Sequence, residues 1–261
     1  MAVEDTDTPN EQCCTIPPFK SDYQPVGKTI TLQVPGNEDL PVYVTGPADS
    51  KTALIGIYDI FGTHPNTQQG ADHLAQQCNS TILLPDFFRG RGWDTNDIPP
   101  KEGREKMQAY IQSIGSWEIV GPDLLVAVSY LRERGVGSIG AYGFCFGGKK
   151  LVQAQSSSSP PYTNLFNALA LIHPTNLSPT DGDLFTVPVA LIPSGGEDPL
   201  VMDAVWESLQ RKDFAGRCVR RDFLEGHHGF ASSRSDWNDP KLAAMAREAY
   251  EVMAKFFAAN L

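Results

Sequence analysis

The stretch Ser138-Ile139-Gly140-Ala141-Tyr142-Gly143-Phe144-Cys145-Phe146-Gly147-Gly148 sets an apolar segment directly before a cysteine that is framed by glycines. The apolar part predicts a strand, and the residues from Gly148 onward predict a helix, so Cys145 falls on the turn between them. Ligands of open α/β sheets bind beyond the carboxyl ends of the strands. Cys145 is therefore predicted to lie at the edge of a sheet where ligands bind.

Apolar segments and helical segments alternate along the rest of the chain. Two segments with alternating polarity, 29–34 and 41–44, predict a hairpin of half-buried strands. Continuously apolar segments are typical of strands covered on both faces, and they lie at 53–58, 81–84, 138–142, 168–172 and 187–192, with a further strand at 217–224. Helices are expected at 66–77, at 101–134 with a break near Gly121-Pro122, from Gly148 onward, and at 201–212 and 240–259. The alternation predicts the α/β class, with a mostly parallel central sheet and helices on both faces.

The domain organisation expected from this pattern is simple. Residues 1–27 are polar and proline-bearing and are predicted to form an irregular N-terminal arm. Residues 28–261 are predicted to form a single domain, because α/β folds of this length often have one core.

Composition excludes several classes of partner. The formal net charge of −10 and the lack of a clustered basic patch argue against nucleic acid and against anionic membrane surfaces. The five cysteines form no CxxC pair, so no zinc framework is predicted. The acidic N-terminus has no cationic start with an apolar core, and no apolar run approaches the ~18 residues that span a bilayer. A cytoplasmic location with free thiols is expected.

The glycines around Cys145 have the spacing of a nucleophile elbow. Gly143-x-Cys145-x-Gly147 has the layout Gly-x-Ser-x-Gly, with sulfur in place of oxygen. The positive end of the following helix favours a thiolate over a thiol. The backbone N–H of Phe146 would face a developing oxyanion. The alternative is a buried structural cysteine whose glycines serve only helix–strand packing.

An elbow of this kind needs an acid and a histidine later in the chain. Asp198 lies in the loop 194–199 after the strand that ends at Ile192, and His227 and His228 follow the strand that ends near residue 224. Each has a second interpretation, because Asp198 could serve as a helix N-cap and the histidines could be ordinary loop residues. Three such groups in this order at one sheet edge favour a hydrolytic triad.

At this point the sequence resembles a known family. Cys145 in GFCFGG, Asp198 in GGEDP and His228 in HHGFA are similar to the cysteine–aspartate–histidine triad of the dienelactone hydrolase family. The segments IYDIFG (57–62), LLPDFFRG (83–90) and ADHLAQQ (71–77) extend the resemblance over roughly residues 28–258, and CCTIPP (13–18) resembles fungal members in particular. The resemblance implies the α/β-hydrolase fold.

The resemblance also implies roles for individual residues. His228 rather than His227 matches the family histidine, and the backbone N–H of Ile60 matches a second oxyanion donor. Asp59 stands where bacterial members carry a glutamate that activates the cysteine. Further residues are expected to bind substrate, with arginines taking its carboxylate and aromatic rings lining the pocket: Arg89 or Arg91, Arg234, Phe61 and Phe88. His173 is expected to be a satisfied histidine beneath the pocket.

These observations predict a cysteine-dependent hydrolase that cleaves an ester or lactone through an acyl-enzyme. Its partner would be a small-molecule ester or lactone, with no cofactor and no metal, and the chain could be a monomer or a homodimer. Two alternatives stay open. One is a thioesterase or acyltransferase of a secondary-metabolite pathway, and the other is a non-catalytic hydrolase-like binding module.

Overall fold

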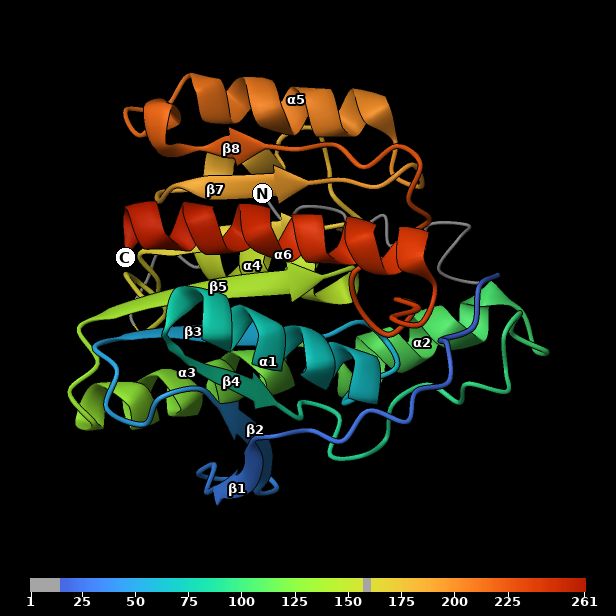
Figure 1. The fold of residues 1–261 in the computed structure, drawn as a ribbon, viewed down its shortest axis with the longest axis horizontal. Coiled ribbons are helices and arrows are strands. Elements are labelled where there is room, and N and C mark those ends of the chain that lie inside the picture. The colour runs from blue at the N-terminus through green and yellow to red at the C-terminus, as the bar shows by residue number, and fades with distance from the viewer. Residues whose placement is uncertain (1–14, 157–160) are drawn as a thin grey trace.

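The computed structural model describes residues 15–156 and 161–261, and its centre is one eight-stranded sheet (Figure 1). The strand order is β1-β2-β4-β3-β5-β6-β7-β8. The strands are β1 (Lys28–Leu32), β2 (Leu40–Thr45), β3 (Thr52–Ile57), β4 (Thr81–Pro85), β5 (Ser138–Phe144), β6 (Ala168–Ile172), β7 (Val189–Ile192) and β8 (Val219–Arg220).

Strand direction follows the polarity patterns of the sequence. Strand β1 is mostly exposed rather than half-buried, and it pairs with β2 in antiparallel fashion, as β2 does with β4. All remaining pairs are parallel. Every residue of β4, β6 and β7 is buried, as expected for apolar strands between two helical layers. The predicted α/β class with a mostly parallel sheet is confirmed.

Helices cover both faces of the sheet. They are α1 (Pro65–Cys78), α2 (Arg104–Ile114), α3 (Trp117–Glu133), α4 (Phe146–Ser156), α5 (Pro199–Gln210) and α6 (Pro240–Asn260), with two short 3-10 helices at Asp181–Leu184 and Ala215–Arg217. In Figure 1, α1 and α6 cross in front of the sheet, while α3 and α4 lie behind it. The two faces correspond to two hydrophobic clusters, one packed under α1 and α6 and one under α3, α4 and α5.

Three boundaries differ from the sequence-based expectation. The long helical region breaks at Gly115 and Ser116, with a bend of 45° between α2 and α3, while Pro122 lies inside α3. The helix after the elbow begins at Phe146 rather than at Gly148. The strand expected over 217–224 keeps only the two residues of β8.

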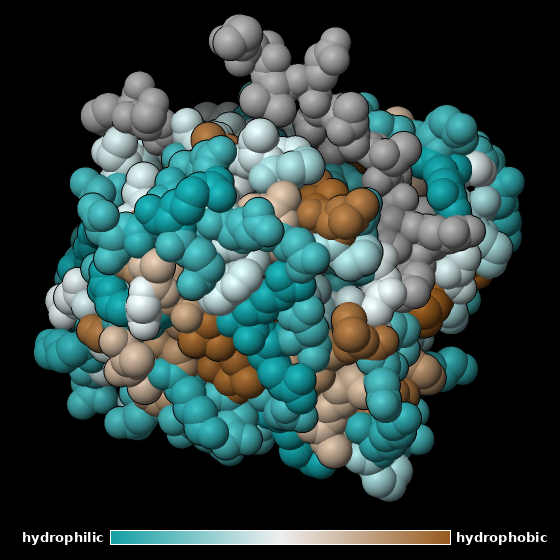
Figure 2. Space-filling model, turned by 90° about the horizontal axis from the view of Figure 1, so that it is seen from above, coloured by the Kyte–Doolittle hydropathy of each residue, from teal (hydrophilic) through white to brown (hydrophobic). Residues whose placement is uncertain are grey.

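No single helix among the described residues is long and apolar enough to cross a membrane, although the bent pair α2 and α3 would meet that test together. The face seen from above is mostly hydrophilic, with several separate hydrophobic patches (Figure 2).

The register of the parallel strands brings several loops to one edge. Ile57 at the end of β3 pairs with Gly143 of β5. Ile172 at the end of β6 pairs with Phe144 on one side and with Ile192 of β7 on the other. The loops that follow β3, β5, β6 and β7 therefore begin side by side at the carboxyl edge of the sheet, where ligands of such folds bind.

The described part of the N-terminal arm, residues 15–27, contains no helix or strand and runs along α1. Tyr23 Oη donates a hydrogen bond to Asp72 Oδ2 at 2.8 Å, and the backbone N–H of Val26 donates to the same oxygen at 3.1 Å. Tyr43 Oη also donates to Asp72, and burial raises the pKa of this phenol. One buried carboxylate on α1 thus fastens the arm to the domain.

Candidate active site

Cys145 occupies a sharp turn between β5 and α4. Its φ angle is +51°, a left-handed conformation that few non-glycine residues adopt. Its N–H donates to the carbonyl of Ile172 at 3.2 Å, and its carbonyl accepts from the N–H groups of Gly148 (3.0 Å) and Thr175 (3.2 Å). The strained turn is therefore held by the neighbouring loop after β6, and the side chain is fully buried.

The glycines around Cys145 are there because the backbones approach too closely for a side chain. A Cβ placed on Gly143 would lie 2.4 Å from the carbonyl carbon and oxygen of Gly147, and one on Gly147 would lie 2.3 Å from the carbonyl oxygen of Ile57. Both distances are shorter than any real Cβ contact, and the atoms met are backbone atoms that cannot move aside. This is the crowding between strand, turn and helix that the elbow spacing predicts.

The two candidate oxyanion donors are the backbone N–H groups of Phe146 and Ile60. Phe146 is the first residue of α4, and Ile60 is in the loop after β3. The carbonyl of Ile60 accepts a hydrogen bond from the N–H of Trp93 at 2.8 Å, which fixes that loop.

His228 is fully buried, and its partner is Glu197. The Nδ1 atom of His228 lies 2.6 Å from Oε1 of Glu197. Glu197 follows β7, and its side chain is 2% exposed. The hydroxyl of Ser194 donates to Oε1 at 3.0 Å, and the N–H of Ser194 donates to Oε2. A parallel bridge between Ser194 and Phe223 brings the loop that carries His228 to the same edge.

The expectation for Asp198 is therefore corrected. Asp198 is exposed and is the N-cap of α5, where its Oδ1 accepts a hydrogen bond from the N–H of Leu200 at 2.9 Å. Pro199, the first residue of α5, completes this helix start. The carboxylate that reaches His228 is its neighbour Glu197, because the capping role turns Asp198 toward the helix.

His173 contacts Phe144, the residue before Cys145, and also contacts His228. Its ring stacks on Phe144 with centroids 5.4 Å apart and meets the ring of His228 edge-on at 5.0 Å. Burial, with smaller contributions from the charges of His228 and Arg234, holds the pKa of His173 well below its ordinary value. Neither ring nitrogen of His173 has a hydrogen-bond partner among the described residues, so the expectation of a satisfied histidine is wrong.

Asp59 connects the loop after β3 to the loop after His228. Its Oδ1 accepts from the N–H of Phe61 at 3.0 Å. Its Oδ2 accepts from the hydroxyl of Ser232 at 2.6 Å and from the N–H and hydroxyl of Ser233. Both oxygens of the buried carboxylate are thus engaged by loop donors, an arrangement that differs from the cysteine activation expected at this position.

Two of the three candidate arginines are engaged elsewhere. Arg89 forms a buried ion pair with Asp123, with Nη2 and Oδ1 2.7 Å apart, and it also donates to the carbonyls of Phe87 and Glu38. Arg91 is half-exposed and pairs with the Glu38 carboxylate at 2.9 Å. The expectation that either arginine binds a substrate carboxylate is corrected, because both guanidinium groups hold the loop after β4 in place.

Arg234, in contrast, lies among the residues of the site. Its guanidinium carbon lies 4.7 Å from the ring centroid of Phe61, and its positive charge contributes to the lowered pKa of both His173 and His227, for which burial is the largest cause. Its Nε donates to the carbonyl of Ile16 in the N-terminal arm. Arg234 and Phe61 are both buried, so they form part of the wall beside the histidines.

The arm reaches this wall at a second point. The N–H of Phe19 donates to the carbonyl of Ser233 at 3.2 Å, and the amide of Asn66 donates to the carbonyls of both residues at 3.1 Å. The Phe19 ring lies 6.4 Å from that of His227. The arm thus contacts the loop that follows His228.

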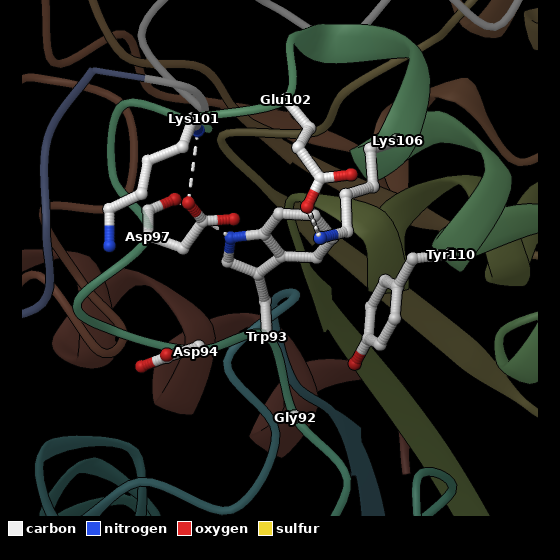
Figure 3. Close-up of a pocket in the computed structure, with 8 residues that line it drawn as sticks. All are labelled: Gly92, Trp93, Asp94, Asp97, Lys101, Glu102, Lys106 and Tyr110. Carbon is white, nitrogen blue, oxygen red and sulfur yellow. Dashed lines mark hydrogen bonds and ion pairs between the residues drawn. The ribbon is translucent and has the colours of Figure 1, made fainter.

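Phe88 is fully buried and packs against Tyr58, Tyr110 and Phe146 with ring centroids 4.9–5.6 Å apart. Beyond it lies an open cavity of about 430 Å³ (Figure 3), lined by Gly92, Trp93, Asp94, Asp97, Lys101, Glu102, Lys106 and Tyr110. The Trp93 indole lies at its centre, and Lys106 faces Glu102 above it. Cys145 and His228 do not line this cavity.

Within residues 15–156 and 161–261, no group of three or more His, Cys, Asp or Glu side chains has an arrangement that could hold a metal ion. The described cysteines Cys78, Cys145 and Cys218 form no disulfide with one another. Cys13 and Cys14 lie outside the described residues.

Comparisons with known proteins agree with this architecture. The sequence model of the Dienelactone hydrolase family matches residues 40–261. An uncharacterised AIM2 family protein of Schizosaccharomyces pombe is 32% identical over 94% of this chain and 98% of its own length. The hydrolase pyvD of Aspergillus violaceofuscus is 26% identical over 76% of this chain and 83% of its own length.

Among solved structures, a putative dienelactone hydrolase from Klebsiella pneumoniae superposes with a TM-score of 0.66 at 15% identity, covering 89% of this chain and 99% of its own. The expected α/β-hydrolase fold is thereby confirmed.

Proposed function

The chain belongs to the dienelactone hydrolase family and is a hydrolase of the ester or lactone type, and we propose that Cys145, His228 and Glu197 form its catalytic triad. The hydrogen bond of 2.6 Å between His228 and Glu197, at the same edge of the sheet as the strained turn of Cys145, carries this proposal. This hydrogen bond supports the order along the chain that this fold uses, namely nucleophile, acid and histidine, with Glu197 as the acid.

The first half-reaction is acylation. Because Nδ1 of His228 is bound to Glu197, its Nε2 atom is the one left to exchange protons with Cys145 and with substrate. The thiolate of Cys145 attacks the carbonyl carbon, and the C=O electron pair moves onto oxygen, which the N–H groups of Phe146 and Ile60 stabilise. The C–O bond then breaks, and the leaving oxygen takes the proton from the imidazolium.

The second half-reaction is deacylation. A water molecule gives a proton to Nε2 of the now neutral His228, and the hydroxide formed attacks the thioester carbonyl. The C–S bond breaks, the carboxylic acid leaves, and the thiolate and imidazolium are restored. The Glu197 carboxylate holds the imidazole ring in one orientation and stabilises its positive charge.

The thiolate form of Cys145 has a second source of stabilisation. Helix α4 begins at Phe146, directly after the cysteine, and its eleven residues direct a positive partial charge toward the sulfur. Thiolates leave more readily than amines, so esters, lactones and thioesters are favoured as substrates over peptides. Among the three candidate arginines, Arg234 is proposed to receive a substrate carboxylate because its guanidinium lies beside Phe61 and its charge acts on His173 and His227.

The experiment that tests the proposal is a comparison of wild type and Cys145→Ala on an aryl ester. The variant is expected to fold and to lose turnover. Mass spectrometry of the wild-type protein during turnover should find the acyl group on Cys145 and not on Cys78 or Cys218, because burial raises the pKa of both control thiols, to about 11 for Cys78. Wild-type rates in Cys145→Ala would refute the proposal.

A further inference from the structure

His173 is a buried polar side chain for which the triad mechanism has no role. The ring is fully buried, and neither Nδ1 nor Nε2 forms a hydrogen bond with any residue that the structure describes. An imidazole always carries at least one N–H donor, and burying polar groups without partners destabilises a fold. A phenylalanine would fill the same space without that cost.

The backbone of His173 is also in an unfavourable conformation. Its φ angle is +37°, and it is fixed by a hydrogen bond of 2.8 Å from its N–H to the carbonyl of Ile192 at the end of β7. The same short loop holds the elbow, since Ile172 and Thr175 bond to the backbone of Cys145. The fold thus tolerates both backbone strain and an unpartnered ring at this position.

The surroundings of the ring indicate what it does. One of its neighbours is Phe144, against which it stacks, and another is Phe230 at 5.8 Å, so these sides are hydrocarbon. A third neighbour is the ring of His228, 5.0 Å away at an angle of 67°. Because Nδ1 of His228 is bonded to the Glu197 carboxylate and the ring of His173 has no hydrogen-bond partner among the described residues, the positive charge that forms during turnover resides on His228.

We propose that His173 is a positioning residue for His228: a neutral imidazole that holds the His228 ring in its plane and offers a dipole to the positive charge that ring carries during turnover. This inference rests on the proposed triad. An imidazolium buried among hydrocarbon groups would be poorly stabilised, whereas a fixed polar ring beside it needs no reorganisation when the charge forms. Glu197 supplies the charge on one side of His228, and His173 supplies the polar wall on another.

The test uses a substitution that should separate stability from activity. His173→Phe keeps an aromatic ring and removes the unpartnered nitrogens, so its midpoint of thermal unfolding is expected to equal or exceed that of wild type. Its kcat on an aryl ester is expected to fall at least tenfold, with KM changed by less than twofold. A residue that only fills space would leave kcat unchanged.

His73→Phe is the matched control. His73 is also partly buried, its Nε2 has no partner among the described residues, and its ring lies 6.0 Å from the rings of Trp237 and Tyr250. Its replacement is expected to leave kcat and KM unchanged.

A second pair keeps the test decisive if His173→Phe does not fold. His173→Gln and His173→Met have similar length and differ in polarity, and Asn is avoided because it would also relieve the positive φ angle. We expect kcat of the Gln variant to exceed that of the Met variant at least fivefold. Equal kcat in the two, or wild-type kcat in the Phe variant, overturns the role of His173 while leaving the triad intact. Retained activity in Cys145→Ala would instead overturn the triad and this inference with it.

Discussion

The neighbouring carboxylates Glu197 and Asp198 should give opposite phenotypes. Glu197 is bonded to His228 and is almost fully buried, whereas Asp198 caps α5 and is exposed. Glu197→Gln keeps the size of the side chain and removes its charge. Asp198→Ala removes the cap and leaves the histidine untouched.

The expected magnitude for Glu197→Gln follows from the buried pair. Breaking a buried charge pair by removing one partner costs about 3–5 kcal/mol. If most of that cost falls on the transition state, in which His228 is charged, kcat decreases roughly 150- to 5,000-fold at about 1.36 kcal/mol per factor of ten. KM should change little, because Glu197 lies behind the histidine and does not contact substrate.

Asp198→Ala should affect stability alone. Loss of an N-cap costs about 0.5–2 kcal/mol of stability, and in a domain of this size each 1 kcal/mol shifts Tm by about 2–4 °C. Asp198→Asn keeps the capping oxygen and serves as the control, with both Tm and kcat near wild type.

The assays are steady-state hydrolysis of an aryl ester and thermal unfolding followed by circular dichroism. The assignment of Glu197 would be refuted by the reversed pattern, in which Asp198→Ala loses kcat by more than a hundredfold at unchanged Tm and Glu197→Gln remains active.

Three other predictions concern packing, substrate charge and pH. Gly147→Ala should lose at least about 1–3 kcal/mol of stability because the new Cβ would lie 2.3 Å from the Ile57 carbonyl oxygen, while Gly216→Ala, where the Cβ meets open space, should be neutral in urea unfolding. For Arg234→Met, the ratio of KM for an ester with a free carboxylate to KM for its methyl ester should rise at least tenfold. Arg91→Met should leave this ratio unchanged. Equal effects of the two substitutions on the ratio would contradict the role of Arg234. Burial lowers the pKa of four histidines, namely His64, His73, His173 and His227. Below about pH 6.5 the unfolded chain therefore binds protons that the folded chain excludes, and the free energy of unfolding should decrease. The decrease should reach up to about 1.4 kcal/mol per pH unit for each of these histidines. A flat stability profile between pH 5 and 7 would contradict this.

Features that depend on local pattern could be predicted from the sequence. Apolar runs without alternation identify strands buried on both faces, and glycines two residues either side of Cys145 identify a tight turn. The placement of Cys145 and His228 at one sheet edge then follows from topology, because parallel strands end at the same edge.

The sequence contains a local signal that distinguishes Asp198 from Glu197, although the resemblance to the family triad favours Asp198. An Asp followed by Pro at the start of a helical pattern is an N-cap followed by the first helical residue, and that role orients the Asp side chain along the helix. In Gly196-Glu197-Asp198-Pro199 the capping signal thus predicts that Asp198 caps the helix, so that Glu197 is the carboxylate available to His228.

The roles of Arg89 and Arg91 could not be predicted in the same way. Their partners Asp123 and Glu38 lie 34 and 53 positions away, and no local pattern indicates which arginine of a loop meets a distant carboxylate. The break between α2 and α3 was expected near Gly121-Pro122, because proline usually ends a helix. Pro122 lies inside α3, past its first turn, and the helix continues through it, whereas the break falls at Gly115 and Ser116.

Backbone strain identifies the same edge of the sheet without reference to any motif. Among the described residues, six non-glycine residues have positive φ angles. Two asparagines, a residue type that tolerates this conformation, precede β4 and β6 at the amino edge: Asn79 and Asn164. At the carboxyl edge the conformation falls on Arg89 after β4, Cys145 after β5 and His173 after β6, with Asn176 following.

Arginine and cysteine rarely adopt a left-handed backbone, and histidine adopts it less readily than glycine, so the side chains at these positions are what the fold retains. For Arg89 the reason is visible, since its guanidinium pairs with Asp123 and fixes the loop after β4. For Cys145 the reason is its proposed role as the nucleophile. His173 has neither a salt bridge nor a hydrogen bond from its ring to explain its strain among the described residues, and its contact with His228 is the feature that distinguishes it from a packing residue.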